Sequence, residues 1–170
     1  KCLNYYGRVM DFKNDSYWHD ITINEKSKQY IKTQISFDIN SNNAIGILDE
    51  INTGYNAINK KRFLSQQTEE EYIDSYENTS SGNFNISSYE YIEEASDDTK
   101  TSERFNYEII NIINNDIVFM NPFFVKFLSK NPFTLEERNY PIDFGYKRNY
   151  TYLATIIIPE GYEVQELPEN

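Results

Sequence analysis

The residues best suited to nucleophilic chemistry are one cysteine and one histidine. Cys2 is the only thiol and His19 the only imidazole in the 170 residues. A cysteine nucleophile needs a base that the core of the fold holds within hydrogen-bond reach. Cys2 is the second residue, in a region where chains fray, and His19 lies in a polar segment. We therefore expect a free thiol and a surface imidazole, and no catalytic residue in this chain.

The chain lacks the sets of residues that usually bind metals and cofactors. One Cys and one His cannot complete the usual zinc ligand set, and no stretch has the spacing of a calcium-binding loop. The six glycines are scattered singly, so neither a phosphate-binding loop nor a nucleophile elbow is present. The carboxylate runs, such as Glu69-Glu70-Glu71, are expected in solvated loops and at helix starts. The sequence predicts no metal and no cofactor.

The aromatic residues suggest a second class of function, which is ligand binding. The chain has 15 Tyr, 11 Phe and a single Trp. Exposed rings could bind a glycan or a peptide, with Trp18, Tyr89 and Tyr91 as the candidates. Packing in the core and on half-buried sheet faces explains the tyrosines more simply, and Trp18 is expected to pin the start of the chain onto the body. Solvent exposure of these rings decides between binding and packing.

Alternating apolar residues predict a mainly β fold, α+β at the margin, arranged as an antiparallel β-sandwich. Asn40–Asn43 is expected as a hairpin loop and Ser87-Ser88 as a bulge. Ile45, Ile47 and Ile51 are expected to point inward, and Tyr150–Ile158, apolar on both faces, to form a central strand. Strands are expected at 31–39, 44–51, 84–94, 104–113, 116–120, 150–158 and 162–166.

The pattern changes to a helical one at Gly54. Tyr55, Ile58 and Phe63 recur with helical spacing, and Thr68-x-x-Glu71 matches a capping box. We expect a helical insertion at about 54–76, as one broken helix or two short ones. The densest basic run of the chain, Lys60-Lys61-Arg62, falls in this insertion and is expected on a solvated helix face.

Charge and hydropathy exclude two kinds of partner. The net charge of −11 opposes binding to nucleic acid. No apolar run approaches the ~18 residues of a membrane-spanning helix. The chain opens on Lys1 without a signal-peptide pattern, so we expect a fragment or a processed product.

The C-terminal stretch contains a series of short motifs, which are Asn131-Pro132-Phe133, Glu137-Arg138, Tyr140-Pro141, Asp143-Phe144-Gly145-Tyr146 and Ile158-Pro159-Glu160-Gly161-Tyr162. With these motifs it resembles the region that follows the transglutaminase-like core in a family of exported, multidomain bacterial proteins. Weaker agreement lies upstream, at Gly54-Tyr55, Ala57 and Arg62, and at Leu3 with Gly7-Arg8. In that family one domain of unknown function precedes the core and another follows it.

The resemblance implies a single β-rich accessory domain at residues 30–170, with residues 1–29 as a lead-in from an upstream core. It implies a periplasmic or cell-surface location and a non-catalytic role, in which the domain packs on the core or helps present its substrate. The family continues past Leu167-Pro168-Glu169 with further strands. We therefore expect the chain to be cut short and to self-associate through an open sheet edge. The residues expected to act structurally are Pro132, Arg138, Tyr140, Pro141, Asp143, Gly145, Pro159 and Gly161, with Arg138 paired to a nearby carboxylate or carbonyl group.

Overall fold

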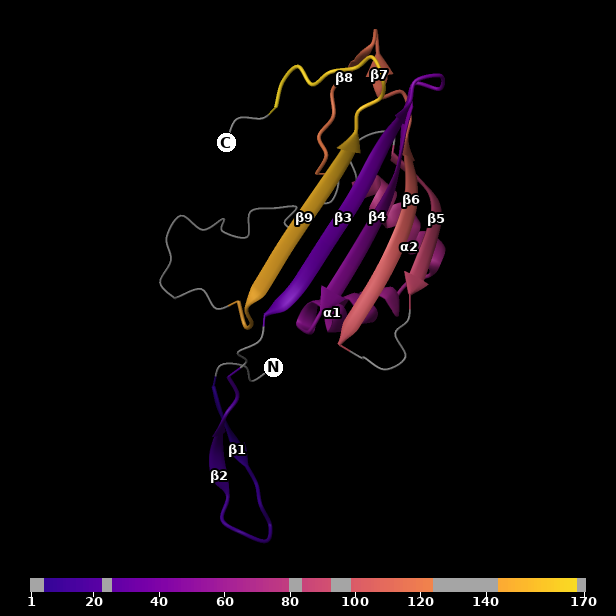
Figure 1. Cartoon of the computed structure of the whole chain (residues 1–170). Helices are drawn as coiled ribbons and strands as arrows, with labels where there is room; N and C mark the ends of the chain where they lie inside the picture. The colour runs from indigo at the N-terminus through magenta and orange to yellow at the C-terminus, as the bar shows by residue number, and fades with distance from the viewer. Residues whose placement is uncertain (1–4, 23–25, 80–83, 93–98, 124–143, 168–170) are drawn as a thin grey trace, which may run out of the picture.

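The computed structural model describes residues 5–22, 26–79, 84–92, 99–123 and 144–167. Its main element is a five-stranded sheet, shown in Figure 1. Neighbouring strands are antiparallel except β3 and β9, which are parallel. The predicted mainly β class is confirmed. In sheet order the strands are β5 (Phe84–Ile92), β6 (Lys100–Ile109), β4 (Asn43–Thr53), β3 (Ser27–Asp38) and β9 (Arg148–Ile157).

Two small hairpins accompany this sheet. β1 (Tyr6–Val9) pairs with β2 (Tyr17–Asp20), and β7 (Ile113–Asn114) pairs with β8 (Ile117–Val118). Asn115 and Asp116 form the turn between β7 and β8 with φ angles of 49° and 61°. Asn and Asp tolerate this left-handed conformation better than other residues that carry a Cβ.

Two helices cover one face of the sheet, and the helical insertion is confirmed. α1 (Tyr55–Leu64) and α2 (Glu69–Thr79) follow β4 directly. The predicted capping box is present: the Glu71 backbone N–H donates to Thr68 Oγ1 at 3.2 Å, and the Thr68 N–H donates to Glu71 Oε2 at 2.8 Å. In the described residues the second layer is thus helical, where the sandwich expectation placed a second sheet (Figure 1).

The core lies between the sheet and the helices. Ile31, Ile35, Leu48 and Phe105 are fully buried, and each contributes about 1.5–3 kcal/mol relative to an exposed side chain. Phe105 also meets the ring of Tyr76 from α2 at a centroid distance of 4.6 Å. α2 is therefore anchored to the sheet by stacked rings from both layers. None of the described helices is long and apolar enough to cross a membrane.

The inward face of β4 differs from the prediction. Ile45 and Ile47 are 51% and 44% exposed, while Ala44 and Leu48 are buried. The register explains this, because Gly46 pairs with Tyr107 of β6 on the helix-covered face. A Cβ at Gly46 would overlap the Tyr107 ring. The small residue therefore makes room for the ring, and the isoleucines take the opposite face.

The prediction of a central strand at Tyr150–Ile158 is wrong in position. β9 lies at one end of the sheet, and among the described residues it pairs with β3 alone. Leu153 and Ile157 are 46% and 45% exposed, so one face of β9 is open. β-branched and aromatic residues favour strands on half-buried surfaces too, so an apolar run does not establish burial on both faces.

The chain after β9 forms no strand at 162–166, so that prediction is also wrong. The Tyr162 N–H donates to the Pro159 carbonyl at 3.2 Å and closes a turn. Val164 and Leu167 beyond it are exposed, so this segment has no buried apolar face to fix a pairing.

Candidate functional site: a buried lysine between two glutamates

The structure does not bring the three candidate ligand-binding rings together. Trp18 is 63% exposed in the β1–β2 hairpin, and the Arg8 guanidinium lies 5.7 Å from its ring centroid. Trp18 thus contacts a residue of its own hairpin. The expectation was that it would pack the start of the chain against the rest of the domain. Tyr89 and Tyr91 lie on β5, in a different sheet, and both are half-buried. His19 is exposed on β2, and Cys2 lies outside the described residues.

The residues predicted to act structurally divide into two groups. Gly145 and Gly161 have φ angles of 76° and 86°, which favour glycine, and Pro159 accepts the turn hydrogen bond described above. Five residues lie outside the described part of the chain, so their predicted roles remain predictions: Pro132, Arg138, Tyr140, Pro141 and Asp143.

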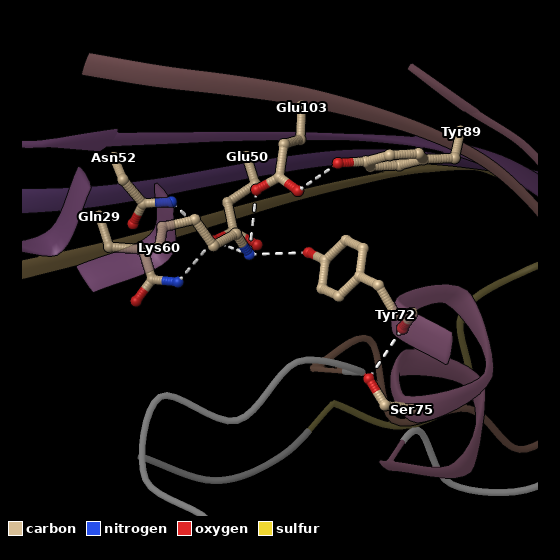
Figure 2. Close-up of polar contacts among 8 residues, drawn as sticks. All are labelled: Gln29, Glu50, Asn52, Lys60, Tyr72, Ser75, Tyr89 and Glu103. Carbon is tan, nitrogen blue, oxygen red and sulfur yellow. Dashed lines mark hydrogen bonds and ion pairs between the residues drawn. The ribbon is translucent and has the colours of Figure 1, made fainter. Parts of the chain in front are cut away.

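In the described part of the chain, a cluster of charged groups in the core centres on Lys60. Its Nζ lies 3.1 Å from Glu50 Oε1 and 3.0 Å from Glu103 Oε2. The Lys60 side chain is 15% exposed, and those of Glu50 and Glu103 are 2% and 0% exposed. Figure 2 shows the ammonium between the two carboxylates. The prediction of a solvated Lys60 is therefore wrong.

Helix geometry explains why Lys60 leaves the solvated face. Residues three and four apart share one side of a helix, so Ala57, Lys60 and Leu64 form a single stripe of α1. Ala57 is fully buried and Leu64 packs against the core. The stripe faces the sheet where Glu50 of β4 and Glu103 of β6 are direct cross-strand partners.

Polar side chains surround the three charges. Glu50 Oε1 accepts hydrogen bonds from Gln29 Nε2 at 2.9 Å and from Asn52 Nδ2 at 2.8 Å. The Tyr89 hydroxyl donates to Glu103 Oε1 at 2.9 Å. Lys60 Nζ also donates to the Tyr72 hydroxyl at 2.8 Å (Figure 2). Buried charges need such partners, because the loss of hydration is otherwise not offset.

One oxygen is less well satisfied than the others. Among the described residues, Glu103 Oε2 has no hydrogen-bond partner of normal geometry, although the Lys60 ammonium lies 3.0 Å away. The ion pair is therefore the contact that compensates this buried oxygen, and the two carboxyl groups sit in unequal environments.

Burial and charge set the protonation of the cluster. Burial would lower the pKa of Lys60, but the Glu50 and Glu103 carboxylates outweigh it and raise that pKa above its ordinary value. Burial raises the pKa of Glu103, against the opposing charge of Lys60. Burial, followed by the charge of Glu103, raises the pKa of Tyr72 and of Tyr89. The resting cluster therefore keeps an ammonium and protonated phenols at neutral pH.

This arrangement presents an amine, two carboxyl groups and two phenols to one another. Because the carboxyl groups are almost fully buried, their chemistry is directed at Lys60 and not at a molecule arriving from solvent. In the described residues, no group of three or more His, Cys, Asp or Glu side chains could hold a metal ion. The sequence carried one signal of the cluster, a glutamate at an inward-facing position of β6, between Thr101 and Phe105.

Comparison with known proteins and protein families gives a match for one part of the chain. A family model described as a domain of unknown function with solved structure, DUF3858, matches residues 115–170. The matched stretch contains β8, β9 and the Pro159–Gly161 turn, and Lys60, Glu50 and Glu103 precede it. No curated protein and no solved structure matches the chain.

Proposed function

We propose that this chain is a non-catalytic accessory domain of an exported, transglutaminase-like protein, in which it packs on the core or helps present substrate to it. The observation that carries the proposal is the aromatic surface of the β1–β2 hairpin. Its five rings range from 54% exposed for Tyr17 to 96% for Phe12, and they are Tyr5, Tyr6, Phe12, Tyr17 and Trp18.

The exposed area of these rings has the size of an interface. At about 200 Å² for a whole aromatic side chain, they present on the order of 700 Å² to solvent. Each partner buries about 800 Å² in a standard protein–protein interface. A two-stranded hairpin is only marginally stable alone in water, so a partner that covers the rings would also stabilise β1 and β2. We therefore assign the hairpin as the surface that contacts the transglutaminase-like core.

Two further findings support an accessory role. The stretch matched by the unknown-function family contains part of the region that resembles the domain following a transglutaminase-like core. The amine of Lys60 is paired to two buried carboxyl groups, so it is not presented to a substrate that arrives from solvent.

The first test is the gene sequence upstream of Lys1, where we expect a transglutaminase-like core. That core, made as a separate protein, is then titrated calorimetrically with this chain. Phe12→Ser in the hairpin should weaken binding at least tenfold, whereas Phe119→Ser, at an 86% exposed ring outside the hairpin, should not. Absence of such a core would overturn the proposal. So would turnover by the isolated chain, in amine transfer or peptide hydrolysis, that is lost in Cys2→Ala.

The exposed Trp18 favours a second candidate function, the binding of a glycan or a peptide. Trp18 with Arg8 offers a ring face and a cation at one place. Tyr89 leaves this candidate set because its hydroxyl is bonded to Glu103 inside the core. Since Trp18 is the only tryptophan, its fluorescence reports binding directly. Saturable changes on addition of oligosaccharides or peptides, absent in Arg8→Ser, would favour binding over core packing.

A further inference from the structure

We propose that the Lys60 amine and the Glu103 carboxyl group condense into an isopeptide bond, which links α1 covalently to β6, with Glu50 carrying the protons. This inference concerns a modification within the chain, and it does not depend on the proposed accessory function.

The distance between the reacting groups meets the first requirement. Lys60 Nζ lies 3.0 Å from Glu103 Oε2, and both side chains come from fixed elements, α1 and β6. The 3.0 Å is measured to the oxygen that would leave, and the amine would bond to Cδ, the carbon that carries this oxygen. Well-oriented groups held in this way can experience effective concentrations of about 10⁵–10⁸ M. Proximity of this kind can drive an amine and a carboxylic acid to an amide, a reaction that dilute solution does not favour.

The two glutamates differ in a way that assigns their roles. Three N–H donors converge on Glu50 Oε1, from Gln29, Asn52 and Lys60. Glu103 instead accepts one phenol hydrogen bond at Oε1, from Tyr89, while the Lys60 ammonium lies 3.0 Å from its Oε2. Burial raises the pKa of Glu103, so Glu103 is poised to hold a proton and to lose its hydroxyl as water. Glu50 is placed to accept the proton of the ammonium, 3.1 Å away.

The step balances without a further reactant. The Lys60 ammonium passes one proton to the Glu50 carboxylate, and the neutral amine attacks Cδ of protonated Glu103. The negative charge that develops on Oε1 receives the hydrogen bond of the Tyr89 hydroxyl, as in an oxyanion hole. Glu50 then protonates the departing hydroxyl at Oε2 and takes a proton from the nitrogen. The products are the Nζ–Cδ amide, one water molecule and a protonated, uncharged Glu50.

The electrostatics of the core favour the product. A buried ion pair carries a desolvation cost that its attraction only partly offsets. The reaction replaces the charges of the Lys60 ammonium and the Glu50 carboxylate with a neutral amide and a neutral acid, and Gln29 and Asn52 still donate to Glu50 Oε1. Because the site is almost closed to solvent, water that leaves is not readily returned for hydrolysis.

Intact mass spectrometry of the folded chain tests the bond. The wild-type chain should weigh less than its sequence mass by one water molecule, and a digest should contain one peptide pair joined through Lys60 and Glu103. Lys60→Arg should have the full sequence mass. Lys61→Arg, one residue along the same helix, should still lose water. Glu103→Gln should lose one ammonia in place of water, because the side-chain amide then supplies the leaving group.

A substitution of Glu50 tests its role as the proton carrier, and several results would refute the proposal. Glu50→Gln should leave most molecules unlinked after folding. A folded wild-type chain of full mass, with residues 60 and 103 in separate peptides after prolonged incubation, would overturn the proposal. A water loss that maps elsewhere, or that persists in Lys60→Arg, would overturn it as well. If Lys60→Arg does not fold, the wild-type digest and the mass of Glu103→Gln still decide.

Discussion

Replacing Lys60 with methionine removes the ammonium that faces Glu50 and Glu103 but keeps a long apolar side chain. The two carboxyl groups are cross-strand partners on β4 and β6, and they are 2% and 0% exposed. Like charges directly opposite each other are destabilising. Removing one partner of a buried ion pair costs about 3–5 kcal/mol. In a domain of this size each kcal/mol lowers the melting temperature by about 2–4 °C, so we expect a fall of roughly 6–20 °C.

The pH dependence shows whether this loss is electrostatic. The charge of Lys60 lowers the pKa of Glu103, so in Lys60→Met that pKa rises further above its ordinary 4.5. An acid whose pKa is raised in the folded state contributes stability that is present below its unfolded pKa and is lost as the pH rises through the folded pKa. The deficit of Lys60→Met relative to wild type should therefore be large at neutral pH and shrink as the pH falls toward 4.5.

Urea unfolding across this pH range, followed by circular dichroism, gives the free energies of unfolding. Lys32→Met is the matched control. Lys32 is an exposed lysine on β3, on the face of the sheet opposite to Glu50 and Glu103. An isopeptide bond in the wild type adds a deficit that is independent of pH, about 4 kcal/mol for the loop from 60 to 103 if it acts as a disulfide does. A deficit equal in Lys32→Met, or one that grows toward acid pH, would refute the electrostatic reasoning.

Three further substitutions test the packing and capping described above. Gly46→Ala should lower stability by about 1–3 kcal/mol in urea titrations, because the new Cβ meets the Tyr107 ring and lies 2.8 Å from the Gln34 carbonyl oxygen; unchanged stability would mean that the ring can move aside. Thr68→Ala should cost about 1 kcal/mol and reduce helix content by circular dichroism, because the N–H of Glu71 loses its partner, whereas Thr151→Ala on β9 should not reduce it. Burial raises the pKa of Tyr107 to about 12 from 10.0, so wild-type stability should fall as the pH rises from 10 to 12, and it should fall less in Tyr107→Phe when alkaline unfolding is followed by absorbance.

Local signals predicted much of the fold. The capping box at Thr68–Glu71, the hairpin loop at Asn40–Asn43 and the bulge near Ser87-Ser88 all form as expected. Each depends on residues within a few positions of one another, so the sequence contains all the information needed. The buried face of β4 could not be predicted from neighbouring residues. The register with β3 and β6 places Ala44 and Leu48 on the inward face, and Ile45 and Ile47 therefore lie on the opposite face.

The position of β9 in the sheet could not be predicted from neighbouring residues either, because its partner strand is distant in the sequence. Its partner β3 ends more than a hundred residues earlier in the chain, and the pairing is parallel. A hydrophobic pattern reports which side chains favour a pleated surface, and it carries no information about how many neighbours the strand has. Among the described residues β9 has β3 as its only neighbour, and the predicted open edge near the C-terminus and self-association through it remain predictions that light scattering can test.

The Lys60 cluster could not be found from its own neighbourhood, because a basic run on a helix is usually solvated. The informative residues are the partners. Glu50 and Glu103 occupy inward positions of two strands, and a carboxylate there is costly unless a cation reaches it. Two such carboxylates in register need a cation from the layer above, and α1 supplies Lys60 beside the fully buried Ala57. We therefore expect the cost of leaving Glu50 and Glu103 unpaired to select the rotation and register of α1 over the sheet, a role in specifying the fold that is separate from any stability the cluster adds.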